Sequence, residues 1–522
     1  MSRLPAAVAL EARVEWRYGI VAAAGALALL WTLVLLAVPA EGARVLAPYL
    51  LFLDTAGFGA LLVVALLLFE RGEGTRAALT ATPLRTGESV AARLIVLVAL
   101  SLAIAAPMPA AALRGRLDEV ARALAPVLLG VAVTSLLLLT LCLAIGARAR
   151  TLQGFLLAMP PALVPLIAVP MLHASGVVEH PVMYAVPTTV GADLIRLGVR
   201  PGSVEAGPAL VALGLGYALL WIAAGAVAAH RAIESGAAAA PRPGRARVRA
   251  LARPGRPSAA VGRGAAGPGA AARTGAMPPV LRFARVDLLG VGRDPMLLVL
   301  LLAPALLAVA LRFGYPPAVE HVRSSYGFDL APHTPAALAA FVLLHVPMMF
   351  GVAGGLRAVE DIDEHVLPAL RVSPLSLGAY FGYRMLVTAL ATLAGLAAAL
   401  PISAMAGAAD PADLAAAVLL ASLQAPVLLL AMTALAGNKV EALVVVKGAG
   451  AVLVLVPVAM WVLPGGWWWP LLALSPAWPV LALPGYSDAG PHPLVSLAVG
   501  TLVTAATAAV LIRRTWRRLD AG

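Results

Sequence analysis

Long apolar stretches recur along the whole chain, with short polar segments between them. Most run for ~20 residues with few charges, the length a helix needs to cross the ~30 Å hydrocarbon core of a bilayer. No stretch shows the ~10-residue strict alternation of membrane barrel strands, and a helix satisfies its own backbone in lipid. The pattern predicts an all-α polytopic membrane protein with about twelve transmembrane helices, at residues 19–38, 47–69, 93–113, 122–145, 154–173, 208–229, 295–312, 335–357, 379–403, 412–436, 441–463 and 493–512.

Composition agrees with this pattern. The 522 residues are 61% hydrophobic and 12% charged, about half the charged share of a typical soluble domain. A soluble enzyme, a disordered chain and a secreted disulfide scaffold are thereby excluded. The single cysteine, Cys142, has no partner for an internal disulfide, so cysteine usage does not indicate the redox compartment.

The distribution of Lys and Arg predicts the orientation. If both termini are cytoplasmic, 30 of the 38 basic residues fall on the cytoplasmic side, as the positive-inside rule requires. No signal-peptide pattern opens the chain, because Glu11 and Glu15 interrupt it. We expect a multi-pass protein of the bacterial inner (plasma) membrane with both termini inside.

Part of the sequence occurs twice. The repeated elements, 291 positions apart, are Glu70 with Asp361, Glu73 with Glu364, Pro83 with Pro374, Leu84 with Leu375 and Arg93 with Arg384. Near the start of each copy, Arg13-Val14-Glu15 recurs as Arg285-Val286-Asp287 at an offset of 272. Six spans per copy in the same orientation predict two parallel repeats, related by a pseudo-twofold axis along the membrane normal.

The repeat divides the chain into three parts. We expect a first six-helix half at 1–229, a cytoplasmic linker at 230–279 and a second six-helix half at 280–522. The linker is rich in Ala, Gly, Pro and Arg and lacks the apolar periodicity of a core. Its arginines have no interleaved aromatic residues, so binding to nucleic acid is not expected.

Each half opens with a short amphipathic stretch and carries, after its second span, a cytoplasmic segment with acids first and Pro-Leu later. This arrangement resembles the ABC-2 type permeases. In that family the loop after the second span is a coupling helix that docks into a groove of the ATPase subunit. The resemblance assigns ATPase coupling to Glu70, Glu73, Pro83, Leu84, Asp361, Glu364, Pro374 and Leu375.

The run Gly437-Asn438-Lys439-Val440-Glu441 resembles the inner loop of actinobacterial fluoroquinolone-export permeases. Together the resemblances cover the chain outside 230–279 and imply a drug exporter with two separate ATPase subunits that hold ATP and Mg²⁺. The fusion of two permease halves departs from the family, in which they are usually separate chains. The first half has Gly146-Ala-Arg-Ala-Arg150 instead of that run, so the halves are expected to contact their ATPases unequally.

No Gly-x-x-x-x-Gly-Lys-Ser/Thr motif occurs in the sequence, so the chain is not expected to hydrolyse ATP by P-loop chemistry. Neither a catalytic constellation nor a metal-ligand spacing of His, Cys and acids stands out. We therefore expect no enzyme activity, no cofactor and no metal in this chain.

Ionisable residues inside membrane spans are functional candidates. Asp54 and His345 are 291 positions apart and hence repeat mates, which predicts that they face each other in the translocation pathway, with Met348 and Met349 nearby. Alternatively, Asp54 lies at the wet outer interface and His345 bonds a neighbouring carbonyl. Lys447 is expected to extend back to the membrane surface, and Gly351 and Gly355 to form a helix-packing face.

The leading hypothesis is the permease subunit of an ATP-driven ABC exporter for a hydrophobic or amphipathic compound. A secondary transporter of the major-facilitator class also has two parallel six-span halves, but its inner-loop motif is missing here. An ABC importer permease is a third reading, supported only faintly by Glu441-Ala442-Leu443 followed by Gly448.

Overall fold

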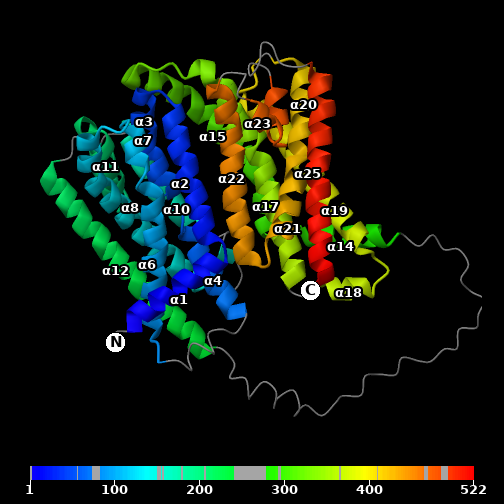
Figure 1. Cartoon of the computed structure of the whole chain (residues 1–522), viewed down its shortest axis with the longest axis horizontal. Coiled ribbons are helices and arrows are strands. Elements are labelled where there is room, and N and C mark those ends of the chain that lie inside the picture. Colours follow the sequence, from blue (N-terminus) through cyan, green and yellow to red (C-terminus); the bar gives the residue numbers. More distant parts are fainter. Residues whose placement is uncertain are drawn as a thin grey trace, which may run out of the picture.

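The computed structural model describes residues 3–55, 57–72, 83–149, 154–155, 158–177, 180–204, 207–239, 278–291, 295–363, 366–407, 409–463, 468–483 and 492–521. Within these ranges all regular secondary structure is helical, as the sequence predicts. The long helices run side by side in one layered bundle, and both termini lie at one end of it (Figure 1). We call this end the terminal face and the opposite end the distal face.

The helices form two groups, which lie mostly to the left and to the right in Figure 1. The first group consists of α1 (Arg3–Arg17), α2 (Ile20–Ala37), α3 (Ala40–Leu50), α4 (Ala60–Gly72), α6 (Thr86–Ala105), α7 (Met108–Ala112), α8 (Leu117–Gly146), α10 (Pro160–Ala174), α11 (Thr189–Val199) and α12 (Pro208–Ala239). The second consists of α14 (Pro279–Val291), α15 (Pro295–Tyr326), α16 (Thr334–Leu338), α17 (His345–Asp363), α18 (Val366–Arg371), α19 (Leu377–Ser403), α20 (Pro411–Ser422), α21 (Gln424–Leu435), α22 (Lys439–Val462), α23 (Trp469–Leu472), α24 (Ala477–Leu481) and α25 (Pro493–Ala521).

Ten helical segments in the described part of the chain are long and apolar enough to cross a membrane. They coincide with ten of the twelve predicted spans, so the protein is a multi-pass membrane protein. The two remaining predicted spans, 47–69 and 154–173, do not form single helices of that length.

The stretch predicted as a span at 47–69 is interrupted. α3 continues into a π-helix at Leu51–Thr55, and α4 begins at Ala60 after a turn. Gly59 in this turn lies so close to α8 that an added Cβ would be 2.8 Å from the Leu139 side chain. A second π-helix, Ala339–Leu343, directly precedes α17. π-helical turns are rare and often lie at functional sites, so the segments that precede α4 and α17 are candidate parts of a functional site.

The stretch predicted at 154–173 yields the 15-residue helix α10, which begins at Pro160 and contains Pro165 and Pro170. Proline lacks the backbone N–H that a helix interior uses, which explains the late start. The helix predicted at 208–229 is longer than expected. α12 continues to Ala239, ten residues beyond the predicted end of this span at residue 229, because this Ala-rich end has high helix propensity. Residues 240–277 of the predicted linker lie outside the described ranges.

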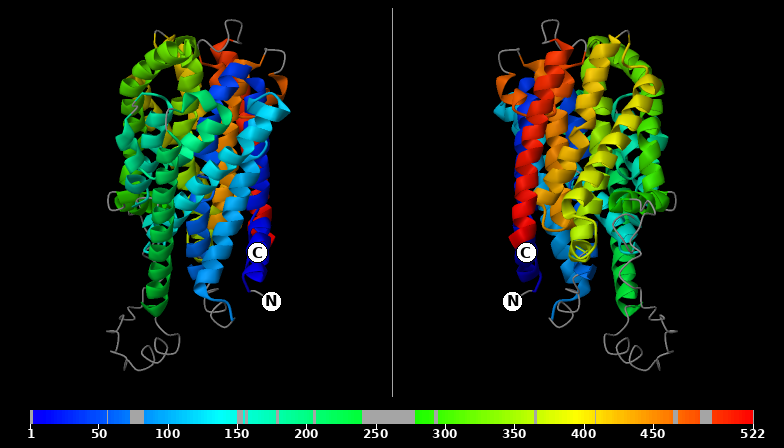
Figure 2. Two further views of the ribbon diagram at one scale, coloured as in Figure 1. Left: turned by 90° about the vertical axis from the view of Figure 1, so that its left-hand side faces the viewer. Right: turned by 90° about the vertical axis from the view of Figure 1, so that its right-hand side faces the viewer.

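The two groups share a large hydrophobic cluster. It combines residues of the first group with residues of α17, α21 and α22, among them Leu356, Met432 and Leu443. α22 lies between the groups and packs against both α2 and α4 (Figure 1). We call this contact the seam. At the distal face α15 arches toward the first group, and the His321 ring nitrogen is hydrogen-bonded to the Ser175 carbonyl oxygen (Figure 2).

Close helix packing within the second group follows the predicted glycine face. α17 packs extensively along α21. Gly351 approaches α21 so closely that a Cβ there would be 2.9 Å from the Ala425 carbonyl oxygen. Gly355, one turn further on, faces Met432. The expected helix-packing role of these two glycines is confirmed.

Candidate functional site

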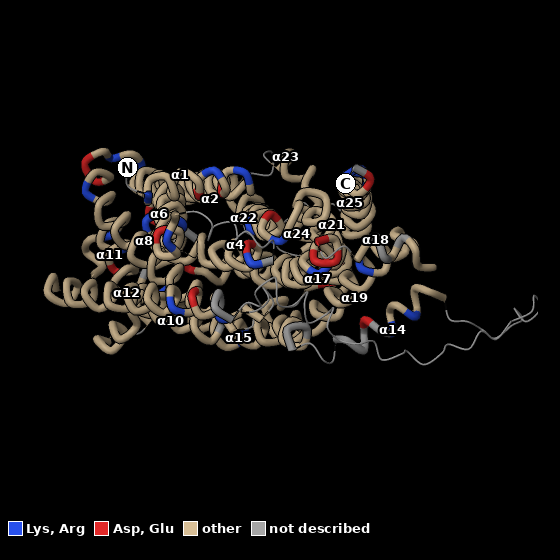
Figure 3. Tube along the Cα trace, turned by 90° about the horizontal axis from the view of Figure 1, so that it is seen from below, with Lys and Arg blue, Asp and Glu red and all other residues tan. Residues whose placement is uncertain are grey.

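Charged side chains of both signs gather at the terminal face. In the backbone trace seen from below, positions of Lys, Arg, Asp and Glu are coloured around α4 and α6 on one side and around α17 on the other (Figure 3). Each of these places holds an arginine, Arg93 or Arg384, bound to two carboxylates from two other helices. We call them the first and the second arginine cluster.

The first arginine cluster joins α1, α4 and α6. Arg93 of α6 is buried, and its Nε donates a 2.6 Å hydrogen bond to Oε1 of Glu11 on α1. Its Nη2 donates to Oε1 of Glu70 at the end of α4. The sequence repeat singled out Glu70 and Arg93, but the role of Glu11 is evident only from the structure.

A third carboxylate, Glu15, lies one turn after Glu11 on α1. Its side chain is 0% exposed, and neither carboxylate oxygen has a hydrogen-bond partner among the described residues. Burial raises the pKa of Glu15 to about 8, and the nearby charge of Glu11 adds to this increase. Arg93 acts in the opposite direction but does not offset the burial. Glu15 is therefore a protonated, neutral acid near pH 7.

The second arginine cluster joins α14, α17 and α19. Arg384 of α19 donates through Nη1 to both carboxylate oxygens of Asp287, at 3.1 and 3.2 Å, and through Nη2 to Asp361 at 3.0 Å. The Tyr383 hydroxyl also donates to Asp287, at 3.1 Å, and the Tyr380 hydroxyl donates to Asp361. Both carboxylates are thus satisfied, unlike Glu15 in the first cluster.

The predicted coupling residues differ in their surroundings. Glu70 and Asp361 belong to the arginine clusters, whereas Glu73 and Glu364 lie outside the described residues. The remaining four follow in the two loops. Pro83 is exposed, and its carbonyl oxygen accepts a 2.7 Å hydrogen bond from Arg3, while Leu84 is half-buried. In the second loop Pro374 is exposed. Leu375 is buried in a hydrophobic cluster with Leu367, Tyr380 and Phe381.

The predicted pathway residues lie at or next to the two π-helices. Asp54 is part of the first π-helix, but its side chain lies outside the described atoms, so its pairing with His345 stays a prediction. His345 is the first residue of α17 and is half-buried. Met348 packs against both large hydrophobic clusters, and Met349 is half-buried.

Lys447 contributes a cation to the seam. Its Nζ lies 5.9 Å from the centroid of the Phe58 ring, which belongs to the turn before α4. A cation over an aromatic face at this distance is attracted by the ring. The lysine therefore contacts the first group across the seam. The sequence predicts instead that its side chain extends back toward the membrane surface.

Sequence reasoning missed a polar cluster around Asp193 of α11. This carboxylate is buried and interacts with His173 Nε2 at 3.3 Å, with Arg196 Nη1 at 3.4 Å and with the Tyr184 hydroxyl. The predicted spans leave this stretch in the connection between residues 173 and 208. The available signal was an acid three residues before an arginine within an apolar stretch, a spacing that puts both on one helix face.

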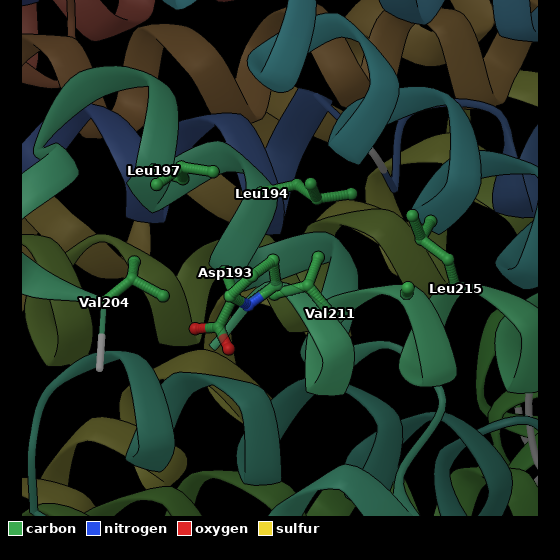
Figure 4. Close-up of a pocket in the computed structure, with 8 residues that line it drawn as sticks. Asp193, Leu194, Leu197, Val204, Val211 and Leu215 are labelled. Carbon is green, nitrogen blue, oxygen red and sulfur yellow. The ribbon is translucent and has the colours of Figure 1, made fainter. Parts of the chain in front are cut away.

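A pocket of about 400 Å³ opens beside this cluster, between α11, α12 and the segment joining them (Figure 4). Its lining is apolar except for Asp193, and includes Leu194, Leu197, Val211 and Leu215. The carboxylate already has three partners, so the pocket offers mainly hydrocarbon contacts to a ligand.

Two family profiles match separate stretches of the chain. The profile described as the fluoroquinolones export permease protein family matches residues 2–235. The profile described as fluoroquinolones export permease protein Rv2686c-like matches residues 287–512. No solved structure matches the chain significantly.

Curated relatives come from Mycobacterium tuberculosis. "Fluoroquinolones export permease protein Rv2686c" is 31% identical over 208 residues, which cover 40% of this chain and 82% of the relative. "Fluoroquinolones export permease protein Rv2687c" is 32% identical over 233 residues, which cover 45% of this chain and 95% of the relative. These matches agree with the resemblance seen in the sequence, and the chain belongs to the family of actinobacterial fluoroquinolone export permeases.

Proposed function

We propose that this chain is the transmembrane permease subunit of an ATP-driven ABC exporter for amphipathic drugs. The observation that carries the proposal is the pair of arginine clusters. In each, one arginine joins three helices: α1, the end of α4 and α6 in the first cluster, and α14, the end of α17 and α19 in the second. Both clusters lie at the terminal face, where a soluble ATPase would act on the two loops.

The clusters suit the transmission of force. An arginine held by two carboxylates cannot lose one partner without leaving a poorly solvated charge, so the three helices resist separation. A displacement of the loop between α4 and α6 is then passed to α1 and α6. The loop between α17 and α19 acts in the same way on α14 and α19.

The ATPase would be supplied by two separate subunits that hold ATP and Mg²⁺. The absence of a P-loop motif from the sequence supports this assignment. Each mycobacterial relative aligns over most of its own length with less than half of this chain. This supports a fusion of two permease halves, with twelve spans in two parallel six-helix repeats about a pseudo-twofold axis.

The basic residues favour a bacterial inner membrane with the terminal face in the cytoplasm. Export then proceeds along the seam toward the distal face. The printed names of the relatives indicate fluoroquinolones as the compounds to test first. Asp54, His345, Met348 and Met349 are the proposed pathway residues, because an acid, an imidazole and adaptable thioethers suit an amphipathic aromatic compound.

The test is co-purification of the full chain with a candidate ATPase in nanodiscs, followed by ATP hydrolysis with and without a fluoroquinolone. We expect drug-stimulated hydrolysis, with co-purification lost in Glu73→Arg and Glu364→Arg. Glu320→Arg reverses an exposed charge at the distal face and is the matched control. Drug export driven by a proton gradient without ATP would contradict the proposal and favour a secondary transporter.

A further inference from the structure

Glu15 is the one acid of the first arginine cluster that the proposed coupling does not use. It is completely buried, yet neither oxygen is hydrogen-bonded to any described residue. A charged carboxylate in such a place loses its hydration without replacement, so it persists there only in the neutral, protonated form.

The charged groups around Glu15 are few. α1 packs against α6 and α2. α2 has no ionisable side chain. α6 carries Glu88, which caps the start of the helix, and Arg93, which binds Glu70 of α4. On α1 itself Glu11 lies one turn earlier. Arg13 and Arg17 of α1 are exposed, so among the described residues Arg93 is the buried cation that a deprotonated Glu15 would meet.

Two carboxylates on α1 thus compete for one arginine. Residues four apart lie on the same helix face, about one turn from each other. In the second cluster α14 carries Phe283 and Asp287 at the same spacing, and only the later position is an acid, which binds Arg384. Arg93 instead binds the earlier acid, Glu11, and leaves the later one buried.

We propose that Glu15 is a proton-binding site that selects the partner of Arg93 on α1. While Glu15 holds its proton, Arg93 binds Glu11. When the O–H bond of Glu15 breaks, the proton leaves to water and the carboxylate takes Arg93 from Glu11, whose own carboxylate turns to solvent. Because the two acids are one turn apart, the exchange shifts α1 relative to α6. Its effect on transport rests on the proposed function, whereas the proton site itself does not.

The first test is an infrared titration of the purified full chain in nanodiscs between pH 6 and pH 10. We expect a protonated-carboxyl band that disappears as the pH rises through about 8 and is absent in Glu15→Gln. Glu320→Gln, at an exposed position, should leave the band unchanged. A band that is missing at pH 6, or that persists in Glu15→Gln, would overturn the proposal.

The second test measures the partner exchange. Spin labels at Arg13→Cys and Gly87→Cys, both exposed positions, report the distance between α1 and the start of α6, and the native Cys142 is buried. We expect the distance distribution to differ between pH 6 and pH 9, and to stay fixed in Glu15→Gln. Equal distributions at both pH values, or a shift that survives in Glu15→Gln, would refute the exchange. Neither test involves an ATPase, so failure of the proposed function is recognised separately by lost co-purification.

Discussion

Replacement of Arg384 by Met tests how firmly the second arginine cluster holds its three helices. The arginine side chain is 11% exposed and makes hydrogen bonds to Asp287 and Asp361. Methionine keeps much of the apolar stem and removes the guanidinium. Both carboxylates then lose their cation, while the hydroxyls of Tyr380 and Tyr383 remain as donors.

The expected cost follows from the burial of the carboxylates left behind. Breaking a buried ion pair by removal of one partner costs about 3–5 kcal/mol. Asp287 keeps 20% and Asp361 15% of its side-chain surface exposed, so water compensates part of the loss. We therefore expect Arg384→Met to lower the free energy of unfolding by about 3 kcal/mol, at the lower end of that range.

The assay is reversible unfolding in mixed micelles by SDS titration, followed by circular dichroism. Arg357→Met removes an exposed arginine from the nearby end of α17 and should cost less than about 1 kcal/mol. Adding Asp287→Asn and Asp361→Asn to Arg384→Met should recover most of the loss, because no buried charge is left unpaired. A single variant that costs less than about 1 kcal/mol, or a triple variant no more stable than the single one, would refute this reasoning.

Three further measurements follow from particular residues. The pKa of Glu15 is about 8 in the folded chain, above its ordinary value of 4.5, so the folded state holds the proton more tightly than the unfolded state. The free energy of unfolding of the wild type relative to Glu15→Gln should therefore fall between about pH 4.5 and about pH 8, by at most ~5 kcal/mol, and then level off. A pH-independent difference in thermal unfolding contradicts the burial argument. Gly351→Val places its Cβ 2.9 Å from the Ala425 carbonyl oxygen and should cost about 1–3 kcal/mol, whereas Gly378→Ala has no neighbour within 4 Å and should change stability by less than about 1 kcal/mol. Drug transport by the Asp54→Asn, His345→Gln variant should lose the part of its pH dependence that the imidazole causes, and an unaltered pH profile removes these residues from the pathway.

The fold was largely predictable because lipid restricts the choices. Uninterrupted apolar stretches must be helical in a bilayer, and ten of them are. The predicted helix boundaries were wrong where particular residues, and not the length of the apolar stretch, decide where a helix breaks, begins or ends. The glycine-rich turn at 57–59 splits one stretch, prolines delay the start of α10, and an Ala-rich end extends α12 beyond its predicted limit.

The site was predictable only where positions 291 residues apart carry the same residue types. Glu70, Asp361, Arg93 and Arg384 were found in this way, and the structure brings each arginine to its acid. The Asp193 cluster depends on α10, α11 and the segment between them coming together, and its sequence match in the second half is not recognisable. Long-range contacts of this kind leave no periodic signal along the chain.

The two clusters differ at the position one turn before the later acid, which is Glu11 on α1 and Phe283 on α14, and this difference should make equivalent mutations unequal. Glu11→Gln removes the α1 partner of Arg93, but above pH 8 a charged Glu15 is available one turn away. Asp287→Asn removes the α14 partner of Arg384, and the position one turn earlier is Phe283, whose ring lies 5.5 Å from the guanidinium and offers only a cation–π contact.

At pH 9 we therefore expect Glu11→Gln to cost less than about 1 kcal/mol in the micelle unfolding assay, and Asp287→Asn about 2–3 kcal/mol. At pH 6 the protonated Glu15 cannot replace Glu11, so the cost of Glu11→Gln should rise toward that of Asp287→Asn. The double variant Glu11→Gln, Glu15→Gln should show the larger cost at both pH values, because it leaves Arg93 with Glu70 alone. If Glu11→Gln and Asp287→Asn cost the same at pH 9, Glu15 is not a second partner of Arg93, and the first half is held as rigidly as the second.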